Sequence, residues 1–410
     1  MSGEAQMPAD ALRSSSLLHT VLWGTTYLFL ASTYFSIAVN SIALGCLATL
    51  WGVSMVTQKR WDVVRTPLDA VFLAYVLAQL LSTVLSVNPV ESFVNSRRLL
   101  LIGIVYFFAT HIVERRQLQR AVLVLLGTAV LVSILGVLKL IFGSPEETVR
   151  LGIFQFYMTT SGLMLIAGLL LIPFVVGRGT PGAVRWAALA ALAPVLISLY
   201  ATVTRGAYLA FVAGIVFIAL VRNRKLLIPL ALIVVLILLF APPYVESRIG
   251  TLTDMSHPEN QTRIMMWTSG IRIAADHPFV GVGDIDLGDL MRHYADPGYP
   301  GVWGHVHNIL LQVLVTLGIL GLIVVVTLFV KVILVEWRLY KEVRHDWFLG
   351  SVVLGALAVV VGIQVQGLTE WSYGDQEIAV LLWTTLGMAL AAGRITVREQ
   401  TIATQKAGGG

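Results

Sequence analysis

The chain has 410 residues, of which 57% are hydrophobic and only 12% are charged, and its formal net charge is +5. A water-soluble domain has about 25% charged residues, so this composition excludes an ordinary soluble enzyme, and we expect no nucleic-acid partner. The apolar residues fall in runs of roughly 17 to 25, long enough to cross a hydrocarbon core as helices. Barrel strands would show short alternating segments instead. The sequence therefore predicts an all-α bundle in lipid, where helices satisfy their own backbone hydrogen bonds.

The apolar runs between charged, glycine or proline breaks predict about twelve spans in a single membrane domain, residues 1–410. Two close-set spans lie between His19 and Val56. The others are Leu68–Leu85, Leu99–Val113, Ala121–Phe142, Phe156–Val176, Trp186–Ala201, Ala207–Val221, Leu226–Phe240, Ile309–Val335, Phe348–Val365 and Ile378–Ala392.

The two ends of the chain carry weaker signals. The polar start, Met1 to Ser16, leads into a full-length span without a small-residue cleavage site, so we expect no cleavable signal peptide. Residues 400–410 end in Ala-Gly-Gly-Gly and predict a disordered tail. The single cysteine, Cys46, excludes an intramolecular disulfide.

The basic residues orient the bundle. Most of the 28 lysines and arginines fall in one of the two alternating sets of loops, and such loops face the cytoplasm. Both termini are therefore predicted to be cytoplasmic, and the long loop 241–304 to face outward. The cations of the outward loops are all arginines, which suit bidentate phosphate recognition.

Inside this outer loop, Gln261–His277 predicts a helix that ends at Pro278. One face of the helix is formed by Arg263, Trp267, Gly270 and Ala274. Arg272 lies about 180° away from Arg263 at 100° per residue. The two arginines should therefore serve different neighbours, and Arg263 is the preferred anion ligand.

A short turn, Thr202 to Gly206, joins the seventh and eighth spans at the outer surface. In one interpretation Arg205 is an interfacial cation that extends to the headgroups. In the other it binds an anion near the positive end of the helix that follows. The residues alone leave both open.

The segment His305-Val306-His307-Asn308 precedes the tenth span. If His307 is helical, it points into the bundle along a stripe with Leu311, Leu314, Gly318 and Gly321, whose glycines permit close helix contact. His305 would then point about 160° away. A lone interfacial histidine is more often structural, but a position facing the bundle interior favours a function.

These segments together resemble a known family. His307-Asn308, followed by nine residues, Gly318, two residues and Gly321, resembles the His-Asn-x9-Gly-x2-Gly signature of O-antigen ligases. Arg263-x3-Trp267 with His277–Gly283 resembles the outer-loop segment of the same superfamily, and Thr204-Arg205-Gly206 its other arginine motif. The superfamily also contains O-antigen polymerases and protein O-oligosaccharyltransferases. One sizeable outer loop and little sequence after the last span favour a ligase.

The resemblance implies a GT-C-like, metal-independent glycosyltransferase without a cofactor, in the inner membrane of a Gram-negative bacterium, with a periplasmic active site. The implied donor is a glycan on undecaprenyl pyrophosphate, and the implied acceptor is the lipid A-core oligosaccharide. His307 would be the base of a single inverting displacement, because imidazole titrates near pH 6.5 and such a base contributes roughly 10²–10⁴-fold. Arg205 and Arg263, with Arg292 and Arg272 behind them, would bind the pyrophosphate.

Further candidates would orient the base or bind the acceptor: Asn308, His305, Trp267 and Glu370. Glu370, with Asp375 and Glu377, surrounds Trp371 and Tyr373 in the outer turn between the last two spans. Aromatic rings beside carboxylates suit sugars. An interfacial aromatic belt with solvated acids fits this turn equally well.

Two alternatives remain. Asp284-x-Asp286 has a form that binds metal-pyrophosphate, and His305-x-His307 offers two zinc ligands. However, aspartates after a glycine-rich turn commonly bond the local backbone, and we expect no metal.

A transporter or flippase would place ionisable residues at mid-span or show related halves. The spans are almost free of charge, which favours a surface-facing enzyme; a polymerase is the nearer alternative.

Overall fold

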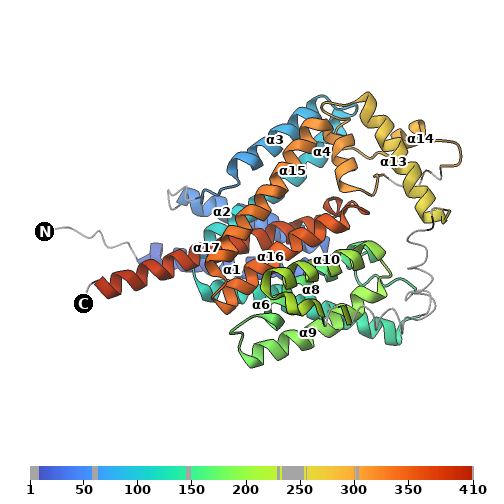
Figure 1. Ribbon diagram of the computed structural model, residues 1–410. Helices are drawn as coiled ribbons and strands as arrows, with labels where there is room; N and C mark the ends of the chain where they lie inside the picture. Colours follow the sequence, from blue (N-terminus) through green and yellow to red (C-terminus); the bar gives the residue numbers. More distant parts are fainter. Residues whose placement is uncertain are drawn as a thin grey trace.

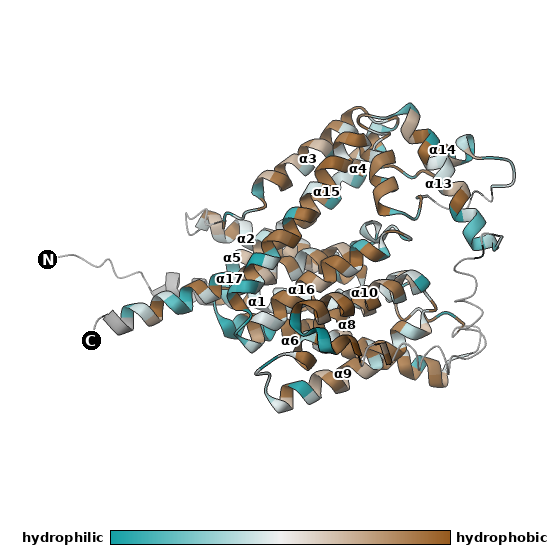
Figure 2. Cartoon of the chain, viewed as in Figure 1, coloured by the Kyte–Doolittle hydropathy of each residue, from teal (hydrophilic) through white to brown (hydrophobic). Residues whose placement is uncertain are grey.

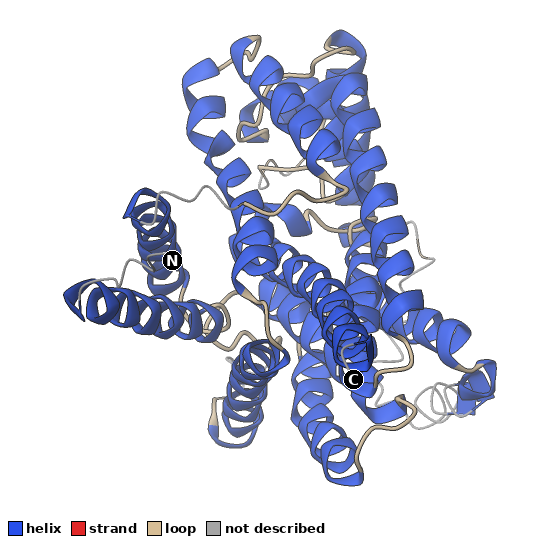
Figure 3. Ribbon diagram, turned by 90° about the vertical axis from the view of Figure 1, so that its left-hand side faces the viewer, coloured by secondary structure: helices blue, strands red, loops and turns tan. Residues whose placement is uncertain are grey.

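The computed structural model describes residues 9–57, 63–144, 149–228, 231–232, 254, 256–299, 301 and 304–408. Within these ranges the chain consists of helices and loops, and no strand is formed (Figure 3). The predicted all-α fold is confirmed.

The helices follow one another along the chain with mostly short connections (Figure 1). They are α1 (Ala9–Ser32), α2 (Ile37–Thr57), α3 (Asp69–Val84), α4 (Pro89–Asn95), η1 (Ser96–Ile102), α5 (Gly103–His111), α6 (Arg115–Phe142), α8 (Tyr157–Val176), α9 (Gly182–Ala201), α10 (Arg205–Arg222), η2 (Arg224–Leu226), α13 (Pro258–Asp276), α14 (Gly288–Tyr294), α15 (Ile309–Val343), α16 (Trp347–Gln366), η3 (Ser372–Gly374) and α17 (Gln376–Gly408).

Nine helical segments in the described part of the chain are long and apolar enough to cross a membrane. In addition, α1 lies where the first span was predicted, and α3 is apolar but only 16 residues long. The predicted span Leu226–Phe240 falls largely outside the described residues, as does the first part of the loop 241–304. The chain is a multi-pass membrane protein, with hydrophobic residues along the bundle and hydrophilic ones gathered toward its ends (Figure 2).

The centre of the bundle is formed by α8, α16 and α17. In the most apolar 18-residue stretch of each of these helices, 83%, 83% and 94% of the residues are buried inside the protein. A helix that is apolar all round is suited to such a central position. By contrast, only 17% and 22% of the residues in the corresponding stretches of α2 and α9 are buried. The covered helices therefore fix the positions of the loops that emerge at their ends.

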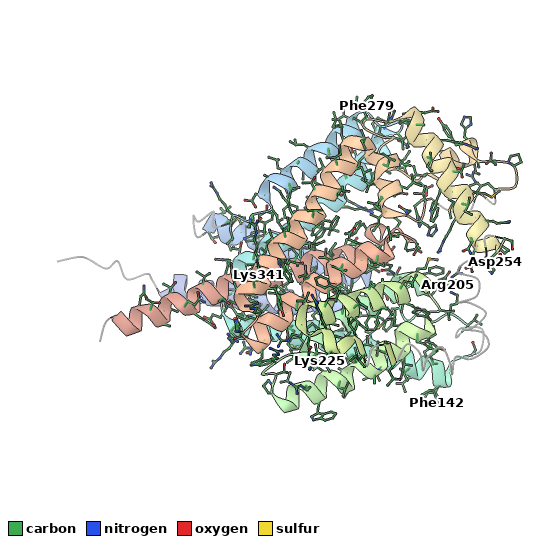
Figure 4. The ribbon with its side chains drawn as sticks, viewed as in Figure 1. Phe142, Arg205, Lys225, Asp254, Phe279 and Lys341 are labelled. Atoms are coloured by element: carbon green, nitrogen blue, oxygen red, sulfur yellow. The ribbon has the colours of Figure 1, made fainter. Side chains whose placement is uncertain are left out.

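We call the end of the bundle that carries α13 and α14 the outer end, following the charge distribution. Arg205 and Phe142 lie toward it, and Lys341 lies toward the opposite end (Figure 4). At that opposite end Arg115 of α6 contacts Asp346 at 2.6 Å and Glu399 of α17 at 2.9 Å. These ion pairs join the far ends of three segments of the bundle.

One prediction about the end of the chain is wrong. Residues 400–408, predicted as part of a disordered tail, continue α17 to Gly408; Ala403 and Gln405 have the high helix propensity that such an extension needs. The tenth span begins at Ile309, as predicted, so the condition that His307 is helical is not met, and the φ of His307 is +48°.

Gly318 also differs from its predicted role in helix–helix contact. Its φ of 64° and ψ of −170° interrupt α15, and a Cβ on it would lie 2.3 Å from the backbone carbonyl of Phe279. In place of a neighbouring helix, the loop after α13 approaches α15 at this point. Glycine is required both by the backbone angles and by the space.

We expect Gly318→Ala to destabilise the protein by about 1–3 kcal/mol or more, because alanine is strained at these angles and meets backbone atoms. Thermal unfolding in detergent measures the change. The matched control is Gly127→Ala in α6, where a Cβ would meet nothing within 4 Å and alanine should be neutral or slightly stabilising. Equal melting temperatures for the two variants would contradict this account of α15.

Candidate active site

The start of α15 is bonded to the loop that follows α16. Asn308 caps the helix, since its side chain accepts a hydrogen bond from the backbone N–H of Leu311 at 3.0 Å. The same side chain donates to the carbonyl of Leu368 at 3.0 Å, and the N–H of Ile309 donates to the carbonyl of Gly367 at 2.7 Å. Asn308 therefore positions the two loops relative to each other.

The residues just before this cap are held in a strained turn. The Trp267 indole N–H donates to the carbonyl of Val306 at 3.0 Å, and the N–H of Val306 donates to Gln312 at 3.0 Å. His307 follows with a positive φ of 48° and a side chain that is almost fully buried. Strained non-glycine residues of this kind cluster at functional sites, and Trp267 acts here as a brace for the histidine.

His307 is paired with a carboxylate. Its Nδ1 lies 2.6 Å from Oε1 of Glu370, and Nε2 of His305 lies 3.9 Å from the same oxygen. Burial alone would raise the pKa of Glu370, but the two histidines and the charge of Arg263 lower it to about 2. Glu370 is thus a carboxylate at any working pH. With Nδ1 donating to it, the neutral ring of His307 carries its lone pair on Nε2.

The predicted Arg205 turn packs against the same loop. A Cβ on Gly206 would lie 2.3 Å from Oγ1 of Thr369, the residue next to Glu370. This close approach explains the glycine and brings the first turn of α10 to the site. Arg205 is 11% exposed and contacts Glu259 of α13 at 2.9 Å.

A small cavity gathers three arginines beside Glu370. Arg205, Arg263 and Arg150 line it, together with the carboxylates Glu259 and Glu370. Arg150 lies over the ring of Tyr157 at 3.6 Å and donates at 3.2 Å to the carbonyl of Val203. Val203 has a φ of 51°, and it and His307 are the non-glycine residues with positive φ in the described part of the chain. Both strained positions therefore flank the site.

Arg150 was not among the predicted site residues. The sequence offered one signal for it: it is one of the arginines predicted to face outward, but it lies outside the motifs that selected Arg205 and Arg263. Only the fold brings the loop before α8 next to the start of α10.

A larger cavity, about 490 Å³ in volume, is lined by both His307 and Glu370. Carboxylates and aromatic rings line it: Glu91, Asp284, Asp286, Asp375, Phe156 and Trp371. It shares Met158 and Glu370 with the arginine-lined cavity. Glu370 therefore lies between the arginine-lined cavity and an acidic, aromatic one, and His307 faces the second.

Asp284 and Asp286 bond to α4 and its neighbours. Asp284 contacts Arg98 at 3.3 Å, and its backbone carbonyl accepts from Asn95 at 3.0 Å. The N–H of Asp286 donates to Glu91 at 2.7 Å. Burial raises the pKa of Asp284 and Arg98 opposes that rise. The acids that resembled a metal motif thus anchor the outer loop, and nothing in the sequence pointed to Glu91 or Asn95.

His305, His307 and Glu370 are a group whose ligand atoms lie within 4.8 Å of one another, as a metal site requires. Two ligands about 2.1 Å from a tetrahedral ion would be about 3.4 Å apart. The 2.6 Å between His307 and Glu370 is instead the length of a hydrogen bond. The geometry fits an acid–base pair better than a zinc site.

Two predicted arginines are not brought to this site. Arg272 pairs with Asp296 at 3.0 Å on the opposite face of α13, and Arg292 pairs with Asp289 of its own helix. Neither lines the two cavities. Arg272 therefore lies away from the site, as its position on the helix opposite to Arg263 predicted.

Comparisons with known proteins bear on the same segments. Residues 187–326 match a family model described as O-antigen ligase, which confirms the resemblance over the part that holds Arg205, Arg263 and His307. No curated protein matches the chain. A solved structure titled "Structural coordination of polymerization and crosslinking by a peptidoglycan synthase complex" contains a similar chain, 20% identical, with a TM-score of 0.48, covering 82% of this chain and 99% of that one.

Inorganic pyrophosphate should bind to the arginine-lined cavity of the purified protein. We expect Arg263→Ala to raise its Kd about tenfold, equivalent to about 1.4 kcal/mol, because a charge that faces the cavity is lost. Arg272→Ala, on the opposite face of the same helix, should leave the Kd unchanged. Titration calorimetry in detergent measures both. Equal weakening by the two variants would show that only net charge matters.

Proposed function

We propose that this chain, which carries an O-antigen ligase domain over residues 187–326, is a membrane glycosyltransferase that moves an O-antigen glycan from undecaprenyl pyrophosphate to lipid A-core oligosaccharide. The site lies at the periplasmic face of a Gram-negative inner membrane, with both termini in the cytoplasm. One observation carries the proposal: His307 and Glu370, 2.6 Å apart, line a cavity of carboxylates and aromatic rings, and Glu370 also lines the neighbouring cavity that holds three arginines.

The two cavities suit the two substrates. The donor carries a pyrophosphate, whose negative charge is matched by Arg205, Arg263 and Arg150. The acceptor offers a neutral sugar hydroxyl, which suits carboxylate acceptors and the faces of Trp371 and Phe156. A pyrophosphate in the acidic cavity would meet like charges, so the donor headgroup belongs with the arginines.

The reaction is a single displacement with inversion. The acceptor oxygen forms a bond to the anomeric carbon while the bond from that carbon to the pyrophosphate oxygen breaks. Nε2 of His307 takes the hydroxyl proton, and Glu370 stabilises the resulting imidazolium. The bonding electrons leave with the pyrophosphate, whose charge the arginines stabilise as it develops. No metal takes part in any step.

The proposal is tested by glycan transfer with purified protein in EDTA, offering lipid-linked O-antigen and lipid A-core. Wild type should transfer, and His307→Ala should be slower by roughly 10²–10⁴-fold, because the base is lost. Growth of longer lipid-linked chains without transfer to lipid A-core would assign a polymerase instead. Activity of His307→Ala close to that of wild type would refute the base assignment.

Glu370→Gln should lower kcat by roughly 10- to 100-fold, less than His307→Ala does, since the amide keeps the shape but not the charge. The acid limb of its pH–rate profile should move to lower pH, because a protonated imidazole without its carboxylate is less stable. That limb cannot come from Glu370 itself, whose pKa is about 2. An unshifted profile would mean that Glu370 has only a structural role.

A further inference from the structure

A second large cavity in the bundle is an apolar groove, about 1010 Å³ in volume, between α2 and the η1–α5 segment. Its walls are small and apolar residues: Leu44, Gly45 and Ala48 of α2, and Leu101, Gly103 and Ile104 opposite. A Cβ on Gly45 or Gly103 would meet nothing within 4 Å. The groove is therefore open space beside two glycines, and no side chain of the described residues fills it there.

The groove is closed at one end and continuous with the site at the other. Toward the cytoplasm, Trp51 lies against Phe107 and His111, with ring centroids 5.8 and 5.6 Å apart. At the outer end the groove shares lining residues with the acidic cavity: Arg98, Phe156, Thr159, Gly374 and Asp375. A single molecule can thus extend from the groove into the cavity beside His307.

The depth of the groove matches one leaflet. From Ser41, which accepts a hydrogen bond from Gln376 at the outer end, to Trp51 the helix rises about 15 Å at about 1.5 Å per residue. Half of a hydrocarbon core of about 30 Å is the same length. The groove therefore fits a chain of a lipid in the leaflet next to the active site.

Its outer end carries both arginines and carboxylates, the latter being Asp375 and Glu377. Arg97 and Arg98 line the groove, and Arg98 also reaches the acidic cavity, where it contacts Asp284. No carboxylate of the described residues lies within ion-pair distance of Arg97, which leaves its charge available to a lipid phosphate. Apolar walls below an arginine are the pattern expected for an anionic lipid.

The geometry of the proposed reaction indicates which of the two lipid substrates the groove binds. In a displacement with inversion the nucleophile approaches from the side opposite to the leaving group. With the pyrophosphate among Arg205, Arg263 and Arg150, the acceptor approaches through the acidic cavity, and the groove opens into that cavity. We propose, on the basis of the proposed function, that the groove between α2 and η1–α5 binds an acyl chain of the acceptor, a phosphorylated glycolipid.

Gly45→Leu tests this assignment, because it fills the groove without meeting protein atoms at its Cβ. The matched control is Gly52→Leu, on the same helix, also with nothing within 4 Å and outside the groove lining. Native mass spectrometry with lipid A-core should show about tenfold weaker binding to Gly45→Leu and unchanged binding to Gly52→Leu. Equal binding to both would overturn the proposal, since the groove would hold only bulk lipid.

Kinetics distinguish the two lipid substrates. Gly45→Leu should raise the KM for lipid A-core about tenfold, and leave unchanged the KM for the polyprenyl-linked donor and for a de-acylated core oligosaccharide used as acceptor. A raised donor KM instead would overturn the proposal and assign the groove to the polyprenyl chain. If wild type transfers glycan to neither acceptor, the proposed function fails, and the lipid-binding comparison still decides what the groove holds.

Discussion

The contact between His307 and Glu370 joins two loops that are 63 residues apart in the chain, and the rest of the site depends on it. The cap at Asn308 and the bond from Ile309 to Gly367 fix the start of α15 to the loop of Glu370. Trp267 fixes the histidine's turn from the side of α13. Because these restraints come from separate elements, His307 keeps a strained backbone conformation that would relax in an unrestrained loop.

The same carboxylate divides the outer end of the bundle by charge. One cavity holds Arg150 from a loop, Arg205 at the start of α10 and Arg263 from α13, and the other holds mostly acids, with Arg98 as its cation. In the proposed reaction this asymmetry would separate a dianionic leaving group from a neutral nucleophile before any chemistry occurs. Under the same proposal the acceptor would approach from the acidic cavity, past His307, toward a donor held by the arginines. The membrane supplies both lipid-linked substrates to this one end of the bundle.

The sequence predicts much of this arrangement, for identifiable reasons. Apolar runs report membrane helices directly, and the four-residue spacing of Arg263 and Trp267 correctly placed them on the face of α13 that meets the site. What the sequence could not show are contacts across long separations, such as Arg150 beside Arg205 and α4 beside Asp284. Nor does a helical pattern reveal a positive φ, so Gly318 was assigned to regular helix although it interrupts α15, and the positive φ of His307 just before that helix was not foreseen. The tail after residue 400 was misjudged because a short polar segment continues a long helix.

A structure with a bound, non-transferable donor lipid tests the central claim most directly. In a cryo-EM map of the protein in a lipid nanodisc, the pyrophosphate should lie among Arg150, Arg205 and Arg263. The first sugar should then face Nε2 of His307, with the acidic cavity open behind it. Density for the pyrophosphate beside Arg97 and Arg98 would contradict the account, because the donor would then occupy the side assigned to the acceptor.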